Sequence, residues 1–402
     1  MTATLQHAGE KKPEGFELRL SLLFGMLFIP NAVNLAYFPL WLRERGFSAV
    51  DIGILLSAPV FVRIIATPVI TFYADRSSER AYAMVGITLA SFLLSLLFFT
   101  NLMFAGVLAL LCLVSAFWSP QVPLADSMAL SGMRRYGVDY ASIRVWGSAC
   151  FFVVTIGGGS LVEHFGAPIV PFMLSAGFFL ALIAAIFSPR VGKMRRLSDA
   201  GPLPVPAKSL RRPAVIALLL ATGLIQGSHG YLYSFGSIYW KESGIGADMV
   251  GILWAVPVLS EIILFKAYRW IFGRASPQIV LLAAGGIAVF RWVFFLVAGA
   301  AGLGFWGFFV AQSLHAFSFG ATYMAQQAYL AHAVPEEQAG SAQGLAVFVH
   351  GIIMSVTMLL SGPLYAQAHG KGFAVMTFIA LAGILVGYKF AKLDSLERRL
   401  TP

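Results

Sequence analysis

Charged residues are scarce in this chain of 402 residues. Asp, Glu, Lys and Arg together make up 11% of it, whereas hydrophobic residues make up 58%. Water-soluble domains carry about 25% charged residues, so this composition excludes an ordinary soluble protein. Most of the protein surface must face lipid.

Cysteine is also scarce, and the usual marks of catalysis are missing. Cys112 and Cys150 are the two cysteines, and both lie inside apolar runs, which excludes a disulfide framework and a cysteine-based metal site. The polar segments contain no phosphate-binding loop, metal-binding cluster or nucleophile triad. We therefore expect no cofactor, no metal and no enzymatic activity, and a gradient or a partner must supply energy. A membrane enzyme is disfavoured because no catalytic groups cluster at one membrane face.

What the chain has in abundance is long apolar runs. About twelve of them are long enough to cross roughly 30 Å of hydrocarbon as helices. They predict an all-α membrane protein with twelve transmembrane helices in two pseudo-symmetric six-helix bundles. The predicted division is an N-terminal tail (1–17), a first bundle (18–188), a linker (189–213), a second bundle (214–391) and a C-terminal tail (392–402). The twelve runs are Leu18–Trp41, Ile52–Tyr73, Ala81–Thr100, Leu102–Leu130, Ala141–Val162, Ala167–Phe187, Ala214–Trp240, Met249–Tyr268, Ile279–Ala298, Leu303–Ala331, Ala339–Leu364 and Phe373–Tyr388.

The positive charges show which side of the membrane each loop occupies. The formal charge is +10, but the basic residues form short clusters between apolar runs, which indicates helices flanked by anionic lipid and no nucleic-acid partner. One set of alternate loops carries most of them, and the opposite side has only Arg43, Arg45, Lys241 and Lys371. This bias predicts a multi-pass protein of a bacterial-type cytoplasmic (inner) membrane with both termini in the cytoplasm.

The two halves of the chain repeat each other. Gly46 to Ile65 reads GFSAVDIGILLSAPVFVRII and Gly244 to Ile263 reads GIGADMVGILWAVPVLSEII, with identities that keep a constant offset of 198. Transporters built from two parallel halves place the solute site near the bilayer midplane, between bundles that rock against each other. The repeat therefore favours transport.

Eight charged or imidazole side chains lie well inside the predicted spans, away from their ends. Each costs about 2.5 to 3.5 kcal/mol on insertion scales, so each needs a partner or a wet cavity. The repeat aligns Arg63 with Glu261, and two hypotheses follow: the two face each other across the pseudo-two-fold axis, or each pairs within its own half. The eight residues are Arg63, Asp126, Arg144, His229, Glu261, Arg291, His315 and His350.

Two groups among them have the composition of a functional site. Asp126 and Arg144 lie on consecutive helices and form either a solute-binding pair or a structural salt bridge. Glu261, Arg291 and His315 come from three consecutive helices, and a carboxylate beside a guanidinium and an imidazole can exchange protons; the alternative for this trio is a purely packing role.

The remaining candidates have plainer alternatives. His229 and His350 can each sit neutral between helices with one hydrogen bond. Six aromatic residues either wall a cavity or pack between helices. They are Tyr37, Trp118, Trp146, Tyr231, Tyr233 and Trp254.

At these residues the chain resembles the major facilitator superfamily, and within it the phenylpropionate permease branch that is related to lactose permease and other oligosaccharide:proton symporters. The most specific segments are SPQVPLADS (Ser119–Ser127), DYASIRVWGS (Asp139–Ser148) and the stretch from IQGSHGYLYSFGSIYW to VGILWAVPVLSEIILF. Asp75 and Arg76, with Arg80 after them, resemble a degenerate copy of the superfamily signature that follows the second helix. Gating or structural roles are assigned to Arg63, Asp75 and Arg76.

The resemblance implies a role for each group. Asp126 and Arg144 match the carboxylate and arginine that bind the solute. Glu261, Arg291 and His315 match the residues that couple protons. In lactose permease the proton-carrying carboxylate lies three residues beyond that histidine, where this chain has Ser318. A serine holds no exchangeable proton at neutral pH, so Glu261, His315 or Asp126 must carry it.

The resulting hypothesis is a monomeric secondary transporter, a proton symporter that imports a small organic solute such as phenylpropionate or a similar aromatic acid by alternating access. Arg144 would bind the substrate carboxylate. A saccharide or nucleoside:proton symporter is the alternative within transport, and a non-transporting membrane receptor or assembly factor is the alternative of another class. The aromatic residues expected beside the substrate are Tyr37, Trp146, Tyr231 and Tyr233.

Overall fold

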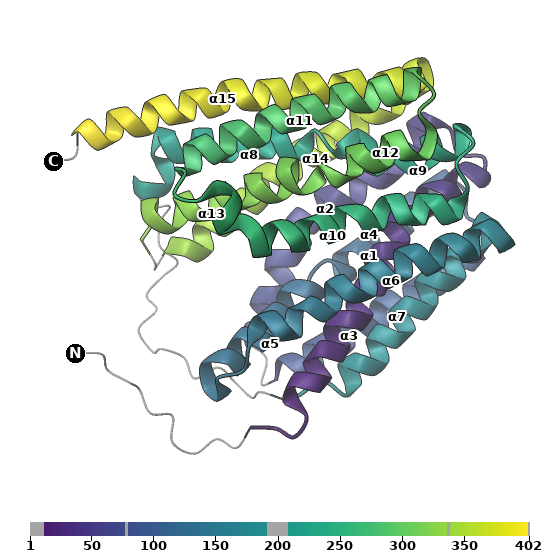
Figure 1. Ribbon diagram of the computed structural model, residues 1–402. Coiled ribbons are helices and arrows are strands. Elements are labelled where there is room, and N and C mark those ends of the chain that lie inside the picture. The colour runs from purple at the N-terminus through teal and green to yellow at the C-terminus, as the bar shows by residue number, and fades with distance from the viewer. Residues whose placement is uncertain (1–11, 77–78, 191–207, 336–337, 401–402) are drawn as a thin grey trace. The chain divides into compact units, whose positions relative to one another are not determined.

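The computed structural model describes residues 12–76, 79–190, 208–335 and 338–400, and the residues with assigned structure in these ranges are helical, without a strand. The first half contains α1 (Phe16–Glu44), α2 (Ala49–Arg76), α3 (Arg80–Ser95), α4 (Phe104–Trp118), α5 (Gln121–Tyr136), α6 (Tyr140–Phe165) and α7 (Val170–Ile186). The second half contains α8 (Pro213–Gly227), α9 (Gly230–Glu242), α10 (Ala247–Phe272), α11 (Pro277–Ala300), α12 (Gly304–Ser313), α13 (Ala321–Ala333), α14 (Ala339–Ala368) and α15 (Phe373–Leu400) (Figure 1).

Ten helical stretches within the described residues are long and apolar enough to cross a membrane. One of them, Ala339–Glu397, contains α14 and most of α15, which separate at His369, where the backbone has a positive φ of 43°. The run expected at Leu303–Ala331 is divided into α12, a π-helical turn η4 (Ala316–Gly320) and α13. The prediction of an all-helical membrane protein is confirmed, whereas the number twelve stays a prediction.

The described residues form two compact units, which do not coincide with the two halves of the sequence. Unit 1 lies within Met1–Asn34, Ile65–Val154 and Pro168–Asp199, and unit 2 lies within Leu35–Ile64, Thr155–Ala167 and Ala200–Pro402. The division into two six-helix bundles stays a prediction. Unit 2 instead contains the second part of α1, the first part of α2 and the last part of α6.

Each unit has its own apolar core. In unit 1, Phe16, Phe24, Met84, Met128 and Ala181 belong to one buried cluster that draws on α1, α3, α5 and α7. In unit 2, α15 packs along α8 and α11, and α14 packs on α8 and α9 (Figure 1). A buried aromatic group joins these helices, with the rings of Phe235 and Tyr365 stacked at 4.3 Å and those of Phe295 and Phe373 also at 4.3 Å.

The internal repeat appears in unit 2 as two equivalent close contacts between helices. A Cβ atom on Gly362 of α14 would lie 2.7 Å from the carbonyl oxygen of Ala49 at the start of α2. A Cβ atom on Gly159 of α6 would lie 2.6 Å from the carbonyl oxygen of Ala247 at the start of α10. Ala49 and Ala247 are separated by the repeat offset of 198. Only glycine allows backbones to approach this closely.

Ion pairs join helix ends next to these contacts. Arg43 of α1 lies 3.3 Å from Glu242 of α9, and Lys241 lies 3.1 Å from Glu163 of α6. Glu163 also accepts a hydrogen bond from the backbone N–H of Ala247. These side chains are partly exposed, so each pair contributes at most about 1 kcal/mol. Their effect is to set which helix ends meet.

The other end of unit 2 is held by acidic side chains of α15. Glu397 lies 2.7 Å from Arg212 and accepts a hydrogen bond from the N–H of Ala214 in the first turn of α8. The hydrogen bond from Arg212 to Glu397 raises the pKa of the guanidinium. Buried Asp394 accepts hydrogen bonds from Tyr329 and from Gln278 of α11. Helices α8, α11, α13 and α15 are therefore fixed to one another at this end.

We predict that Gly362→Val lowers the thermal stability of the purified protein, because its branched side chain meets the Ala49 carbonyl and forces α2 from α14; overpacking of this kind costs about 1 to 3 kcal/mol. Gly159→Val should act similarly at the symmetric contact. Gly157→Val is the control, since a Cβ atom there meets nothing within 4 Å. Unchanged melting temperatures in detergent for the first two variants would contradict the assigned contacts.

Candidate functional site

A break in the helix places the first polar side chains of the site. Helix α8 ends at Gly227 and α9 begins at Gly230, so Ser228 and His229 lie between two helical segments. The hydroxyl of Ser228 accepts a 2.9 Å hydrogen bond from the indole N–H of Trp292 on α11. This bond fixes α11 beside the break, with Arg291 next to His229. Broken helices of this kind build the solute and ion sites of many transporters.

Arg291 is fully buried, and every hydrogen bond recorded for its guanidinium goes to an uncharged acceptor. A buried cation is tolerable only when its N–H groups are satisfied. The acceptors are His229 Nε2 (2.7 Å), Gln312 Oε1 (2.6 Å), the Ala311 carbonyl (2.7 Å), His315 Nδ1 (3.3 Å) and Ser318 Oγ (3.3 Å). We call Arg291, its four side-chain acceptors and Glu261 the Arg291 cluster.

Gln312 is held in place by a proline on another helix. Pro257 lies inside α10 and has no N–H, so the carbonyl of Leu253, four residues earlier, loses its helical partner. The side-chain amide of Gln312 donates a 2.8 Å hydrogen bond to that carbonyl, while its oxygen accepts from Arg291. Gln312 was not predicted from the sequence, although Pro257 in the middle of a spanning helix was a signal that a polar side chain must lie opposite.

His315 connects Arg291 to the acid of the cluster. Its Nε2 lies 3.3 Å from the Glu261 carboxylate, and its Nδ1 faces the guanidinium. Because a guanidinium only donates, Nδ1 must accept and Nε2 must carry the hydrogen that is donated to Glu261. The partners of His229 impose the opposite tautomer, since Nε2 faces Arg291 and Nδ1 lies 3.1 Å from the Gln226 carbonyl.

These tautomers restrict where a proton can bind. A second proton on either imidazole would occupy the nitrogen that accepts from Arg291 and would set two cations against each other. Ser318 donates to the His315 carbonyl at 3.1 Å, so its oxygen is available to accept from Arg291. Glu261 is thus the group of the cluster that can gain or lose a proton without breaking a bond to Arg291.

The π-helical turn η4 follows His315 directly and includes Ser318. Such turns insert extra backbone into a helix and are frequent at functional sites. In this one the N–H groups of Phe317 and Ser318 both approach the Leu314 carbonyl, at 3.2 Å each. The turn gives His315 and Ser318 their shared orientation toward Arg291.

Unit 1 contains a second charged group, which the sequence predicted as Asp126 and Arg144. The Arg144 guanidinium lies 3.5 Å from Asp126 and 4.5 Å from the centre of the Phe28 ring. The hydroxyl of Tyr140 donates a 2.8 Å hydrogen bond to the same carboxylate oxygen. Tyr140 was not predicted, although it lies one helical turn before Arg144 on α6. About a third of each charged side chain is exposed, so the pair is accessible to a small polar molecule.

The predicted aromatic residues divide into buried and accessible ones. Tyr37 and Tyr231 are buried, and their hydroxyls donate to the carbonyls of Thr155 and His369. Tyr233 lies at the Arg291 cluster, with its ring centre 5.8 Å from that of His229. Trp146 is 55% exposed, and two residues along a helix place it on the face opposite Arg144. Tyr233 is therefore the predicted aromatic residue that the described part of the structure places against a charged cluster.

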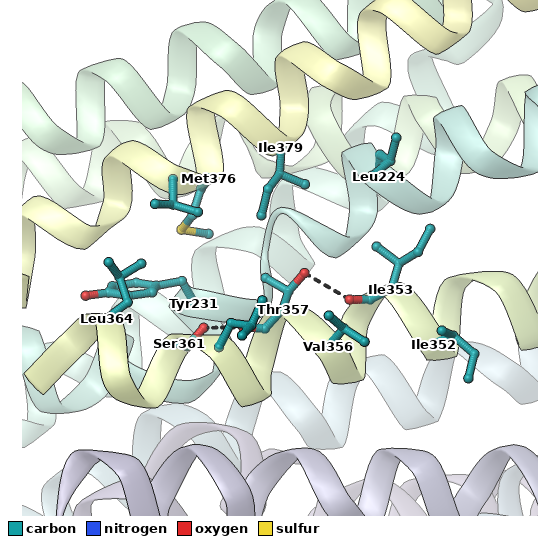
Figure 2. Close-up of a pocket in the computed structure, with 12 residues that line it drawn as sticks. Leu224, Tyr231, Ile352, Ile353, Val356, Thr357, Ser361, Leu364, Met376 and Ile379 are labelled. Atoms are coloured by element: carbon teal, nitrogen blue, oxygen red, sulfur yellow. Dashed lines mark hydrogen bonds between the residues drawn. The ribbon is translucent and has the colours of Figure 1, made fainter.

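Figure 2 shows the residues that line a cavity, with Tyr231 among them. The cavity has a volume of about 340 Å³, and none of its lining residues belongs to either charged group. It lies between α14 and α15, with Leu224 of α8 and Tyr231 of α9 also lining it. The hydroxyls of Thr357 and Ser361 donate to backbone carbonyls of their own helix. The lining therefore offers an apolar surface and suits no charged solute.

The gating candidates give a mixed result. Arg63 and Glu261 form no ion pair within the described residues; Glu261 meets His315 instead. Asp75 and Arg76 end α2, but their side chains lie outside the described part of the structure.

His350 lies 2.9 Å from the Thr222 hydroxyl, which donates to Gln326. No group of three His, Cys, Asp or Glu side chains among the described residues could hold a metal ion.

Apolar spanning helices that are broken at buried polar clusters define a multi-pass membrane transporter. Comparison with known families agrees: residues 18–378 match the family described as "MFS_1 like family". The chain belongs to this family of transporters and is therefore not an enzyme.

Two curated relatives are transporters of chemically different solutes. The chain is 28% identical over 279 residues to the "Probable 3-phenylpropionic acid transporter" of Escherichia coli (strain K12), an alignment that covers 68% of this chain and 72% of the relative. It is 29% identical over 287 residues to the "Maltose permease" of Geobacillus stearothermophilus, covering 69% and 68%. The crystal structure of the nucleoside transporter NupG superposes with a TM-score of 0.77 at 14% identity, covering 94% of this chain and 99% of that one. This likeness shows the fold.

We predict that Gln312→Leu destabilises the protein more than Gln327→Leu on the same predicted span. The first substitution leaves the Leu253 carbonyl and an Arg291 N–H without partners at a buried site, which costs about 1 to 3 kcal/mol for each group. Gln327 pairs with Gln343 at the surface, so water replaces its partner. Equal melting temperatures in detergent for the two variants would show that Gln312 does not support Arg291.

Proposed function

We propose that the protein is a proton-coupled symporter that imports a small aromatic carboxylic acid by alternating access. The observation that carries the proposal is the hydrogen-bonded series Glu261–His315–Arg291–His229, in which one acid can exchange a proton while its neighbours keep fixed tautomers. An acid that can exchange a proton near a guanidinium within a spanning helix is the element that coupling to a proton gradient requires. Similarity to a phenylpropionic acid transporter supports the aromatic acid as substrate.

The proton step follows from the geometry of the cluster. With Glu261 ionised, its charge offsets that of Arg291 through the neutral bridge of His315. When Glu261 accepts a proton, His315 still donates to it, but Arg291 loses its counter-charge. The two states differ in electrostatic energy within a medium of low dielectric constant. Such a difference favours the conformation that better compensates the charge of Arg291.

The glycine contacts and ion pairs of unit 2 support alternating access. They join α2 to α14 and α6 to α10 through Gly362 and Gly159, and they join helix ends through Arg43 and Glu242. A gate of this kind must open and close in each cycle, and partly exposed ion pairs of low net energy suit that requirement. We assign this end as one gate of the transporter. Twelve spans, cytoplasmic termini and an inner-membrane location complete the proposal, supported by the loop charges.

Glu261→Gln should abolish uptake driven by a pH gradient while leaving counterflow exchange of substrate intact. Glutamine resembles the protonated acid and still bonds to His315, but it cannot release a proton, so only the exchange half of the cycle remains. The measurement is tracer uptake into proteoliposomes with an imposed gradient or with preloaded substrate. Glu14→Gln, at an exposed position, serves as the control. Uptake at the wild-type rate by Glu261→Gln would disprove the assigned role.

A saccharide or nucleoside:proton symporter is the second candidate. The Asp126, Tyr140 and Arg144 group carries both donors and acceptors, which suits sugar hydroxyls as well as a carboxylate. The relation to a maltose permease at similar identity supports this reading. The described mid-helix charges of unit 2, Arg63 and Arg291 against the single carboxylate of Glu261, favour the acid.

Uptake of radiolabelled 3-phenylpropionate into vesicles with an inwardly directed proton gradient should exceed that of maltose and uridine under the same conditions. The gradient should be collapsed with an uncoupler in the control. Accumulation of a sugar or nucleoside, with none of the acid, would replace the first proposal by the second.

A further inference from the structure

Among the described charges at membrane depth in unit 2, Arg63 is the one without a counter-charge. It lies near the middle of α2 (Ala49–Arg76), and its side chain is exposed. Within the described residues it has no hydrogen bond, ion pair or ring contact. An arginine at this depth must face a wet cavity or a partner, because contact with lipid costs at least about 2.5 kcal/mol.

Neighbouring residues on α2 show that this part of the helix faces protein. Ile64, the next residue, packs against Gly351 of α14, where a Cβ atom would lie 2.8 Å from its side chain. Thr67 lies one turn further on the same face as Arg63, and its hydroxyl bonds to that of Ser119 at 2.9 Å. Ser119 lies at the break between α4 and α5. Side chains directly beside Arg63 and one turn beyond it therefore pack on protein, while Arg63 itself is exposed.

The charge balance of unit 2 indicates what Arg63 would bind. The mid-helix charges of this unit, within its described residues, are those of Arg63, Glu261 and Arg291, so two cations stand against one carboxylate. Arg291 is balanced by Glu261 through His315. With Glu261 ionised, the positive charge of Arg63 is left uncompensated. With Glu261 protonated, the charges of both Arg63 and Arg291 are uncompensated. An anion is the ligand that removes this excess.

Arg144 is less suited to binding the substrate carboxylate than the sequence suggested. It is already paired with Asp126, and its guanidinium covers the rings of Phe24 and Phe28. A substrate carboxylate there would have to displace Asp126 or accept its repulsion. Arg63 offers all five N–H donors of a planar guanidinium, which matches a carboxylate with two parallel hydrogen bonds.

We propose that Arg63 is the residue that binds the carboxylate of the substrate, and that one proton on Glu261 accompanies each monovalent anion, so that transport moves no net charge. This inference rests on the proposed function and names its anion-binding residue. Protonation of Glu261 increases the excess positive charge and strengthens anion binding. A bound anion in turn favours the proton on Glu261, because the coupling between two sites is reciprocal.

The test measures binding by the purified full chain in detergent. Three aromatic acids, benzoate, phenylacetate and 3-phenylpropionate, are each compared with the alcohol of the same carbon skeleton. Wild-type protein should bind at least one acid about tenfold or more tightly than its alcohol, as expected for a charge-assisted bond. Arg63→Gln should remove this preference, and Arg63→Lys should keep part of it. Arg269→Gln, at an exposed position near the end of α10, removes the same charge and should leave the preference unchanged.

The outcomes separate the two proposals. If Arg63→Gln keeps the wild-type preference, the role of Arg63 is disproved while proton symport stands. If the wild type binds none of the acids, both the acid substrate and the role of Arg63 are disproved. A loss of preference in Arg269→Gln equal to that in Arg63→Gln would show a general effect of net charge and would also overturn the assignment.

Charge movement gives an independent measurement on the wild type. In proteoliposomes, an imposed pH gradient should drive uptake of the bound acid, whereas a potassium diffusion potential without a pH gradient should not. Uptake that increases with an inside-negative potential would mean that net positive charge enters, and would overturn the one-to-one balance of proton and anion. Loss of response to the pH gradient would instead contradict proton symport itself.

Discussion

A buried guanidinium inside the apolar part of the protein is the constraint on which the rest of unit 2 depends. Arg291 reaches no carboxylate directly among the described residues, so its charge is tolerable only because uncharged acceptors surround it and Glu261 offsets it across His315. The helix break at Ser228, the proline in α10 and the π-helical turn after His315 all serve to place those acceptors. Irregular backbone at this depth is acceptable because polar side chains pair with the freed groups.

An indirect ion pair differs in function from a direct one. A guanidinium bonded to a carboxylate holds that acid ionised, which would prevent it from carrying a proton. His315 separates the two charges, while the acceptors around Arg291 keep it away from Glu261. The presence of Ser318 in place of a carboxylate fits this arrangement, because a second acid beside Arg291 would pair with it directly. The cluster thus holds one acid, Glu261, at one remove from the guanidinium of Arg291.

Much of the fold could be predicted because the pattern that specifies it is local. The apolar runs predicted the helices, and the offset of 198 found in the sequence also separates Ala49 and Ala247, the residues of two equivalent close contacts. Glu261, Arg291 and His315 were found as a group because charged residues in apolar runs stand out. Gln312, Tyr140 and Ser228 were missed, since polar uncharged residues are common in spanning helices and become informative only when their partners are known. Tyr231 and Trp146 were selected as aromatic residues, but burial and helix face decide what an aromatic side chain can contact.

Composition and periodicity by themselves determined that this is a helical membrane protein with two related halves, because each apolar run must bury its own backbone bonds in lipid whatever its neighbours are. Only the tertiary structure decided which charges are compensated. Arg63, Arg144 and Arg291 are the same residue type in similar apolar surroundings. Within the described residues, one is paired with a carboxylate, one is satisfied by neutral acceptors and one has no partner. Pairing depends on side chains that distant helices bring within about 3 to 4 Å, a distance that no spacing along the chain specifies.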